Sequence, residues 1–172
     1  MIKIGKDISS FSTYSCQPRT KKELKEIINE RISKESKQCN LNDIDTSLIE
    51  DMSELFLYSS FTGDISKWNV SNVTDTHEMF AYSKFNNDIS EWDVSNVKDM
   101  TGMFYCTPAF NCDISNWNIK NVNSMWSMFD RSKFNQNISN WEIDTNCDIR
   151  GMFHNCLIKD EFIPKSLRKC SR

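Results

Sequence analysis

A repeat of 24 to 25 residues runs through most of this 172-residue chain and constrains its fold more than any other feature. Four tryptophans recur at this interval, and five phenylalanines recur beside them as a second column. A fixed period in this range indicates an array of stacked units, none of which can bury its apolar face alone. The columns are Trp68, Trp92, Trp117 and Trp141, and Phe56, Phe80, Phe104, Phe129 and Phe153.

Each unit is predicted to contain one short strand and one short helical turn. Between Ile65 and Val73 the pattern W-x-V alternates with the period of two that a half-buried strand needs. Asp75 then precedes a segment whose Met79 and Phe80 would face inward from one N-capped helical turn. Stacking about five such units predicts an α/β repeat fold, a β-solenoid with one continuous core. Capping-box spacing occurs in Asp51 and Glu54, and in Asp75 and Glu78.

The flanks of the repeat array are predicted to be its caps. Thr20 and Glu23 have capping-box spacing, and apolar residues then recur at helical spacing through about residue 36. Terminal caps keep a repeat array soluble, so we expect this helix to cover the first repeat. Phe162, Ile163 and Pro164 are expected to close the other end. The predicted parts are an N-terminal segment with its capping helix (1–40, helix at about 20–36), a solenoid (41–157) and a C-terminal cap or tail (158–172).

The charge is balanced overall but unevenly distributed. The chain has 21 basic and 24 acidic side chains, and no apolar run approaches the roughly 18 residues of a membrane span. This composition predicts no membrane span and no nucleic-acid partner. Residues 1–40 carry 9 basic and 5 acidic groups, residues 41–157 carry 7 and 17, and residues 158–172 carry 5 and 2. An acidic array between two basic caps points to cationic partners or to head-to-tail contacts.

No residue pattern in the chain indicates an enzyme, a metal site or a cofactor. Seven cysteines without a CxxC pair predict free thiols, although Cys106 with Cys112, and Cys147 with Cys156, could pair in an oxidising compartment. His77 and His154 lie in no pattern that defines a nucleophile or a metal ligand. One aspartate column could be read as a calcium site, but one carboxylate per coil favours hydrogen bonds to loop N–H groups. That column is Asp64, Asp88 and Asp113, with Asn137 last.

The segment from Phe85 to Phe104 resembles the repeat of BspA-type leucine-rich-repeat surface proteins. The same repeat occurs in a domain of unknown function associated with mycoplasma lipoproteins, and the resemblance covers about residues 20–157. It implies a right-handed, leucine-rich-repeat-like β-solenoid without catalytic residues, in a family regarded as interaction or adhesion modules and often displayed at the surface. One difference is that valines (Val73, Val97 and Val122) stand where a leucine-rich repeat carries its ladder asparagine.

The residues that flank each inward tryptophan and valine are predicted to form an exposed partner-binding face. We expect a non-enzymatic protein-binding monomer that uses this face, with adhesion or host interaction as one form of that role and a basic protein surface as its partner. The alternatives are an ordinary solvated surface, and a structural protein that stacks end to end through its caps. The predicted face consists of Lys67, Asn69, Ser71, Glu91, Asp93, Ser95, Asn116, Asn118, Lys120, Asn140, Glu142 and Asp144.

Two further expectations concern the surface and the location of the protein. Trp126 lies outside the main tryptophan column and is the one aromatic residue expected at the surface. The N-terminus lacks the continuous apolar segment of a signal peptide. The chain as written is therefore expected to be cytoplasmic, or at the cell surface or secreted where a leader has been removed.

Overall fold

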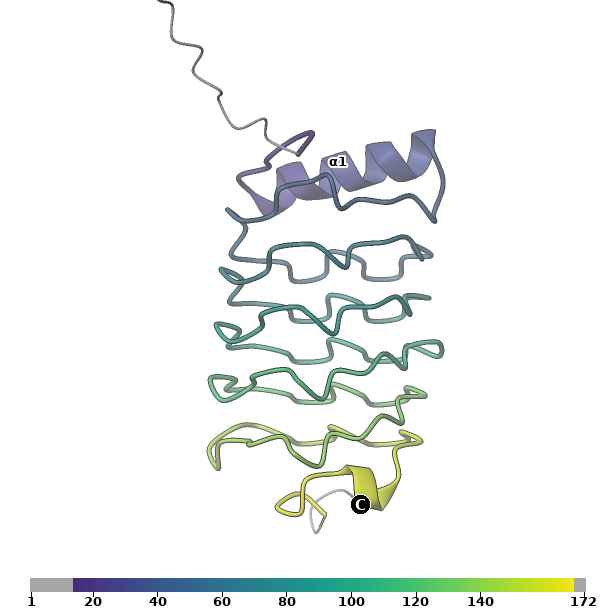
Figure 1. Cartoon of the computed structure of the whole chain (residues 1–172). Coiled ribbons are helices and arrows are strands. Elements are labelled where there is room, and N and C mark those ends of the chain that lie inside the picture. Colours follow the sequence, from purple (N-terminus) through teal and green to yellow (C-terminus); the bar gives the residue numbers. More distant parts are fainter. Residues whose placement is uncertain (1–13, 169–172) are drawn as a thin grey trace, which may run out of the picture.

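The chain winds into a stack of similar coils, of which the computed structural model describes residues 14–168 (Figure 1). The coils follow one another from the purple N-terminal part to the yellow C-terminal part. One α-helix, α1 (Lys21–Lys34), lies across the first end, and a 3-10 helix, η1 (Asp160–Phe162), lies at the other. The remaining residues, among them Cys170, lie outside the described part.

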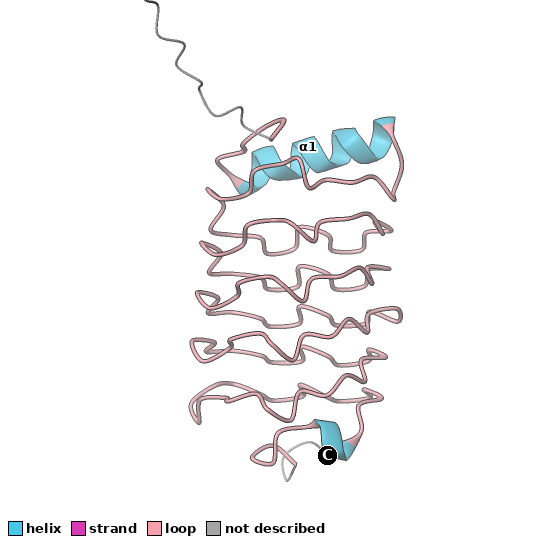
Figure 2. Ribbon diagram, viewed as in Figure 1, coloured by secondary structure: helices cyan, strands magenta, loops and turns pink. Residues whose placement is uncertain are grey.

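The predicted β-solenoid is wrong in its strands, because residues 14–168 contain no β-strand (Figure 2). In the segment 65–73, the backbone turns instead, and Trp68 N–H donates to Ile65 O at 3.1 Å. Just before it, Asp64 Oδ1 accepts from Ser66 N–H at 2.9 Å. Short polar side chains that bond nearby N–H groups compete with ladder formation. The W-x-V alternation therefore directs side chains inward and outward without pairing the backbone into a sheet.

Neighbouring coils are joined instead by isolated parallel bridges at one recurring position. This position is the Asp or Ser with which each predicted helical turn begins. The bridges at this position are Asp51 to Asp75, Asp75 to Asp99, Asp99 to Ser124, and Ser124 to Asp148. Two further bridges, Cys16 to Ile44 and Asn40 to Asp64, lie near the N-terminal end. The coils therefore stack in a constant register along the array, as the 24- to 25-residue spacing requires.

The predicted helical turns are also wrong. In residues 75–82 every second N–H donates to the following coil, as Glu78 N–H does to Thr101 O at 2.8 Å. Of the intervening N–H groups, those of Met79 and Ala81 bond three residues back, to Thr76 O and Glu78 O at 3.1 Å. Two left-handed residues within each segment accompany this alternation, here Glu78 with a φ of 49° and Tyr82 with a φ of 55°. The first of them lies where two of the repeats carry glycine. The residues at this position all have positive φ: Glu54, Glu78, Gly102, Ser127 and Gly151.

The predicted capping-box pairs consequently close turns rather than helices. Asp75 Oδ1 accepts from His77 N–H at 2.8 Å, two residues along the chain, and Asp51 Oδ1 accepts from Ser53 N–H in the same way. An Asx turn of this kind satisfies one backbone donor beside the bridge. Met79 and Phe80 are nevertheless fully buried, as predicted.

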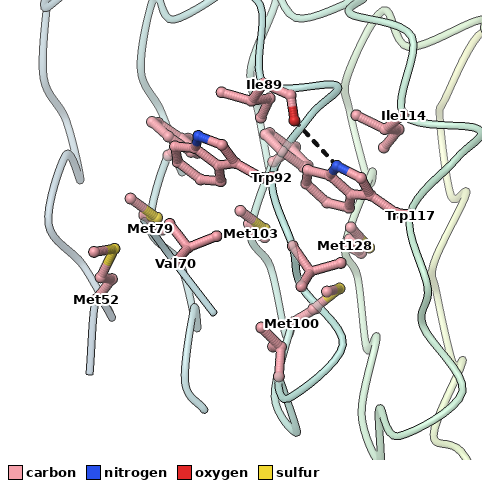
Figure 3. Packing of buried hydrophobic residues seen from close by; sticks show 14 of the residues in the cluster. Met52, Val70, Met79, Ile89, Trp92, Met100, Met103, Ile114, Trp117 and Met128 are labelled. Atoms are coloured by element: carbon pink, nitrogen blue, oxygen red, sulfur yellow. Dashed lines mark hydrogen bonds between the residues drawn. The ribbon is translucent and has the colours of Figure 1, made fainter. Parts of the chain in front are cut away.

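Columns of stacked aromatic rings form the core. The five phenylalanines that begin with Phe56 lie with neighbouring ring centroids 5.5 to 5.9 Å apart and nearly parallel. Each buried tryptophan donates from Nε1 to a carbonyl of the preceding coil, as Trp117 does to Ile89 O at 3.1 Å (Figure 3). Buried indole N–H groups need such a partner, so these bonds fix each coil on the one before it.

The two ends of the core are covered differently. On α1, Leu24 and Ile28 are buried against the first coil, and Thr20 Oγ1 accepts from Glu23 N–H at 3.2 Å as its N-cap. At the other end, Ile163 and Leu167 are buried beside η1.

Candidate partner-binding face

The twelve residues of the predicted face lie at outward positions between the buried tryptophans and valines. Ten of them are exposed, and Ser71 and Ser95 are partly buried. Their neighbours Trp92 and Val94 are buried, so the side chains alternate inward and outward here even though the backbone is not a strand. Each of four consecutive coils thus presents three side chains of the predicted face.

Several of these side chains also hold their own coil in shape. Asp93 Oδ1 accepts from Ser95 N–H at 3.1 Å, and Asn69 Oδ1 accepts from both N–H and Oγ of Ser71. The hydrogen bonds from Ser95 lower the pKa of the Asp93 carboxyl. Asp144 Oδ1 accepts from a backbone N–H in the same way. The face is therefore ordered by its own hydrogen bonds before any partner binds.

An asparagine ladder runs beside the face. Asn96 Nδ2 donates to Ser71 O, in the preceding coil, at 2.7 Å. Asn72 and Asn121 make the same bond, at 2.8 Å, to the carbonyls of Ser47 and Ser95. The ladder residue is thus the one before each valine, which corrects the expectation that valine had replaced it. The recurring Asn-Val pair was the sequence signal for this ladder.

The charges of the face are partly paired. Lys120 Nζ lies 2.9 Å from Glu142 Oε2, in the next coil, and both side chains are exposed. Exposed pairs of this kind are worth about 0 to 1 kcal/mol, so they leave both groups free to exchange partners. Glu91 and Asp93 lie together on another coil and are exposed. The acidic groups therefore remain accessible at two places along the stack.

A shallow hollow lies on the face between two of its later coils. Its lining combines amide and charged side chains with the edges of two tryptophans, Trp117 and Trp141. The side chains of the predicted face that line it are Asn116, Asn118, Lys120, Asn140 and Glu142. The hollow therefore offers donors and acceptors of both kinds to whatever contacts the face.

Trp126 is not the one aromatic residue at the surface. It is 52% exposed, as predicted, but Tyr58 is 71% and Tyr82 is 43% exposed. The Tyr58 and Tyr82 rings stack with centroids 4.7 Å apart, and Tyr105 meets Tyr82 edge to face at 5.1 Å. A hydrogen bond with Tyr82 raises the pKa of Tyr105 to about 12. Sequence analysis missed this stack because only two of these tyrosines share a repeat column.

Within residues 14–168, no hydrogen bond joins a cysteine to a histidine. The six described cysteines are free, as predicted, and burial raises the pKa of Cys147 to about 11. Burial also raises the pKa of Cys156, which disfavours the reactive thiolate. His154 Nδ1 lies 3.2 Å from Asp130 Oδ1, and His77 lies near Glu78.

The aspartate column bonds loop backbone, as the preferred interpretation predicted. Asp88 Oδ1 accepts from Ser90 N–H at 2.9 Å, and this bond lowers the pKa of the carboxyl. Asp64, Asp113 and Asn137 accept from a serine two residues later in the same way. Within the described residues, no group of three or more His, Cys, Asp or Glu side chains could hold a metal ion.

The repeat array matches one family model, described as Mycoplasma protein of unknown function, DUF285. Two overlapping matches cover residues 22–133 and 82–163, which include α1 and the whole predicted face. Comparison with curated proteins and with solved structures found no match. In the part of the chain that the structure describes, no helix has the length and apolar character needed to cross a membrane.

Proposed function

The chain belongs to the Mycoplasma DUF285 family, whose function is unknown, and we propose that it is a non-enzymatic protein-binding module. The proposed binding surface is the predicted face from Lys67 to Asp144. The observation that carries the proposal is the regular array of outward polar side chains on coils whose geometry is already fixed by hydrogen bonds. A preordered surface loses little conformational entropy when a partner binds.

The charge of the face indicates the kind of partner. Glu91 and Asp93 lie on one coil, and Glu142 and Asp144 lie on another. Acidic groups at two fixed places favour a partner with a basic surface, because complementary potentials speed association and exclude wrong partners. A basic protein surface is therefore the proposed ligand class.

A role at the cell surface is the finer form of this proposal. The segment from Phe85 to Phe104 resembles the repeat of BspA-type surface proteins, which are regarded as interaction and adhesion modules. Adhesion or host interaction would use the same face. End-to-end stacking of whole chains has less support, because α1 already covers the first coil.

The proposal is tested by removing the charge of the face without disturbing the turns. Asp93→Asn and Asp144→Asn keep the oxygen that accepts the backbone N–H, and Glu91→Gln and Glu142→Gln complete a neutralised variant. Partner capture and the affinity for a labelled nona-lysine peptide are measured for both proteins. We expect the variant to lose about tenfold in affinity, equivalent to about 1.4 kcal/mol.

The matched control neutralises four glutamates outside the face. The control variant should bind as tightly as the wild type because its face is unchanged, although both variants lose four negative charges. Equal affinities in the neutralised and control variants would show that the face does not bind the basic partner. The control substitutions are Glu26→Gln, Glu30→Gln, Glu50→Gln and Glu161→Gln.

A further inference from the structure

Each of the first four coils donates four backbone hydrogen bonds to the coil that follows it. In the fourth coil, for example, Ser127 N–H donates to Arg150 O at 3.0 Å and Phe129 N–H to Met152 O at 2.9 Å. All bonds of this set have N···O distances between 2.7 and 3.0 Å. Their donors are Met52, Glu54, Phe56 and Tyr58; Thr76, Glu78, Phe80 and Tyr82; Met100, Gly102, Phe104 and Cys106; and Met125, Ser127, Phe129 and Arg131.

The last coil carries the same four donors, but within residues 14–168 no coil follows it. The equivalent N–H groups belong to Ile149, Gly151, Phe153 and Asn155, and none of them has an acceptor within residues 14–168. Gly151 and Asn155 keep the left-handed φ of their two repeat columns, at 66° and 53°. The backbone of this C-terminal edge, residues 149–155, is therefore shaped like its covered counterparts.

The cap at this end covers a different part of the last coil. Phe162 O, in η1, accepts from Ile138 N–H at 3.0 Å, and Ile163 is buried nearby. Phe153 is 8% exposed, whereas Phe80, Phe104 and Phe129 of the same stack are fully buried. The C-terminal edge thus combines unpaired donors with a phenylalanine ring that is slightly less buried than its counterparts. Such an edge is a template for pairing with another polypeptide.

We propose that the C-terminal edge binds a segment of a partner polypeptide, which runs parallel to it with the turn-containing backbone of a covering coil and places an aromatic side chain over Phe153. The four junctions inside the molecule show the chemistry of such a segment, because each covering coil offers carbonyl groups at alternate residues. The covering coil also extends the phenylalanine stack, as Phe153 does over Phe129 at 5.9 Å. This is the edge-pairing mode of peptide recognition, in which main-chain bonds give affinity and side chains give specificity.

The first coil of a second copy does not fit as the occupant. The face of that coil that would have to dock is covered by α1, since Lys21 Nζ donates to Ser53 Oγ at 2.6 Å and Lys25 Nζ to Glu54 O at 3.2 Å. Leu24 and Ile28 are buried beneath the same helix. The proposed occupant is therefore a single segment of a partner rather than a whole second stack. This surface is separate from the predicted face, so either proposal can fail without the other.

The probe is a fluorescein-labelled peptide with the sequence of residues 123–132. In the intact chain this segment covers the third coil, and its Ser124, Trp126, Met128 and Asp130 carbonyls accept the four bonds. Anisotropy should show saturable binding of this peptide to the full chain. The same peptide with Phe129→Asp should bind at least about tenfold more weakly, because it cannot extend the ring stack. Equal binding of the two peptides, or no binding, would overturn the proposal.

A pair of protein variants tests whether the edge supplies the donors. Ile149→Pro removes one donor N–H, whereas Ile149→Ala shortens the same side chain and keeps that N–H. We expect the proline variant to lose at least about fivefold in peptide affinity relative to the alanine variant. Thermal melts of both variants establish that they are folded. Equal affinities in two folded variants would contradict pairing at the edge.

Amide hydrogen exchange provides a readout that does not depend on substitution. The amides of Gly151, Phe153 and Asn155 should exchange faster than those of Ser127 and Phe129, and peptide binding should slow them severalfold. If the peptide protects amides elsewhere but leaves the edge unchanged, the proposal is wrong. The same holds if the chain merely self-associates at high concentration and the edge amides remain unprotected.

Discussion

At its N-terminal end the stack is covered by an amphipathic helix of fourteen residues, whereas at its C-terminal end a three-residue 3-10 helix covers only part of the last coil. The helix brings its own internal hydrogen bonds, so only its apolar stripe has to match the coil below it. At the other end, continuing the backbone hydrogen bonds between coils would require a further coil, and within residues 14–168 there is none. The comparison teaches that a stack of this kind can be closed at one end by a helix that buries its apolar stripe and adds side-chain bonds, while its backbone donors stay open at the other.

The largest expected effect concerns apolar burial at the two ends. Leu24→Ala should lower the free energy of unfolding by about 3 kcal/mol, because Leu24 is fully buried between α1 and the first coil. Leu167→Ala should cost about 1 to 2 kcal/mol, since Leu167 lies at the edge of the smaller cap. Urea denaturation with a constant m value measures both. Equal losses would mean that the two caps stabilise the stack to the same extent.

The next effect concerns the start of α1. Thr20→Ala should lower the free energy of unfolding by about 1 kcal/mol, because Thr20 Oγ1 satisfies the otherwise free Glu23 N–H. Thr20→Ser retains the hydroxyl and should stay close to the wild type. The same urea titration distinguishes the variants. A serine variant as unstable as the alanine variant would show that the methyl group, rather than the cap, is what matters.

The smallest effect is electrostatic and lies at the last coil. The hydrogen-bonded Arg150 guanidinium, 2.6 Å from Asp148, lowers the pKa of that carboxyl to about 2. Because the folded pKa lies below the unfolded value of about 3.9, the stabilisation is present above about pH 4 and is lost as the pH falls toward 2. Arg150 is exposed, so solvent screens the pair and Arg150→Ala should leave stability near neutral pH almost unchanged.

An NMR titration of the Asp148 carboxyl checks this last prediction. The Asp148 pKa should rise in the Arg150→Ala protein, while that of Asp43 should not move. Asp43 is the matched carboxylate at the other end, where hydrogen bonds from Ser15 and Arg31 lower its pKa. A rise at both carboxylates would show that the two ends are electrostatically coupled through the stack.

The sequence predicted directions of side chains better than it predicted backbone structure. Helix α1 follows from the N-cap at Thr20 and from the helical spacing of Leu24 and Ile28, which are local features. The buried columns follow from the period alone. The strand at residues 65–73 was wrong because alternation is equally compatible with turns that Asx side chains close.

The helical turn was wrong for a related reason. Inward-facing side chains at Met79 and Phe80 are compatible with a helix. They are equally compatible with a turn-containing segment that bonds to the next coil and has left-handed residues. Gly102 and Gly151 share a repeat column with Glu78, and two glycines in one column were the available sign of positive φ.

The two candidate sites also differ in how far the sequence could predict them. The outward positions of the predicted face could be located from the period, because they alternate with buried tryptophans and valines. The open donors of Gly151 and Phe153 could not be located, because in sequence the last repeat resembles the repeats before it. What distinguishes it is the neighbour it lacks among the described residues, which is a property of the stack.

The uniform junctions between coils make the length of this protein adjustable. Every junction uses the same four backbone bonds and the same contact between phenylalanine rings, so removing residues 75–98 would leave Asp51 to pair with Asp99 in the register that Asp75 now provides. Recombination between equivalent positions of two repeats could therefore shorten or lengthen the chain by whole coils. Such changes would move the two differently finished ends closer together or farther apart without altering either of them.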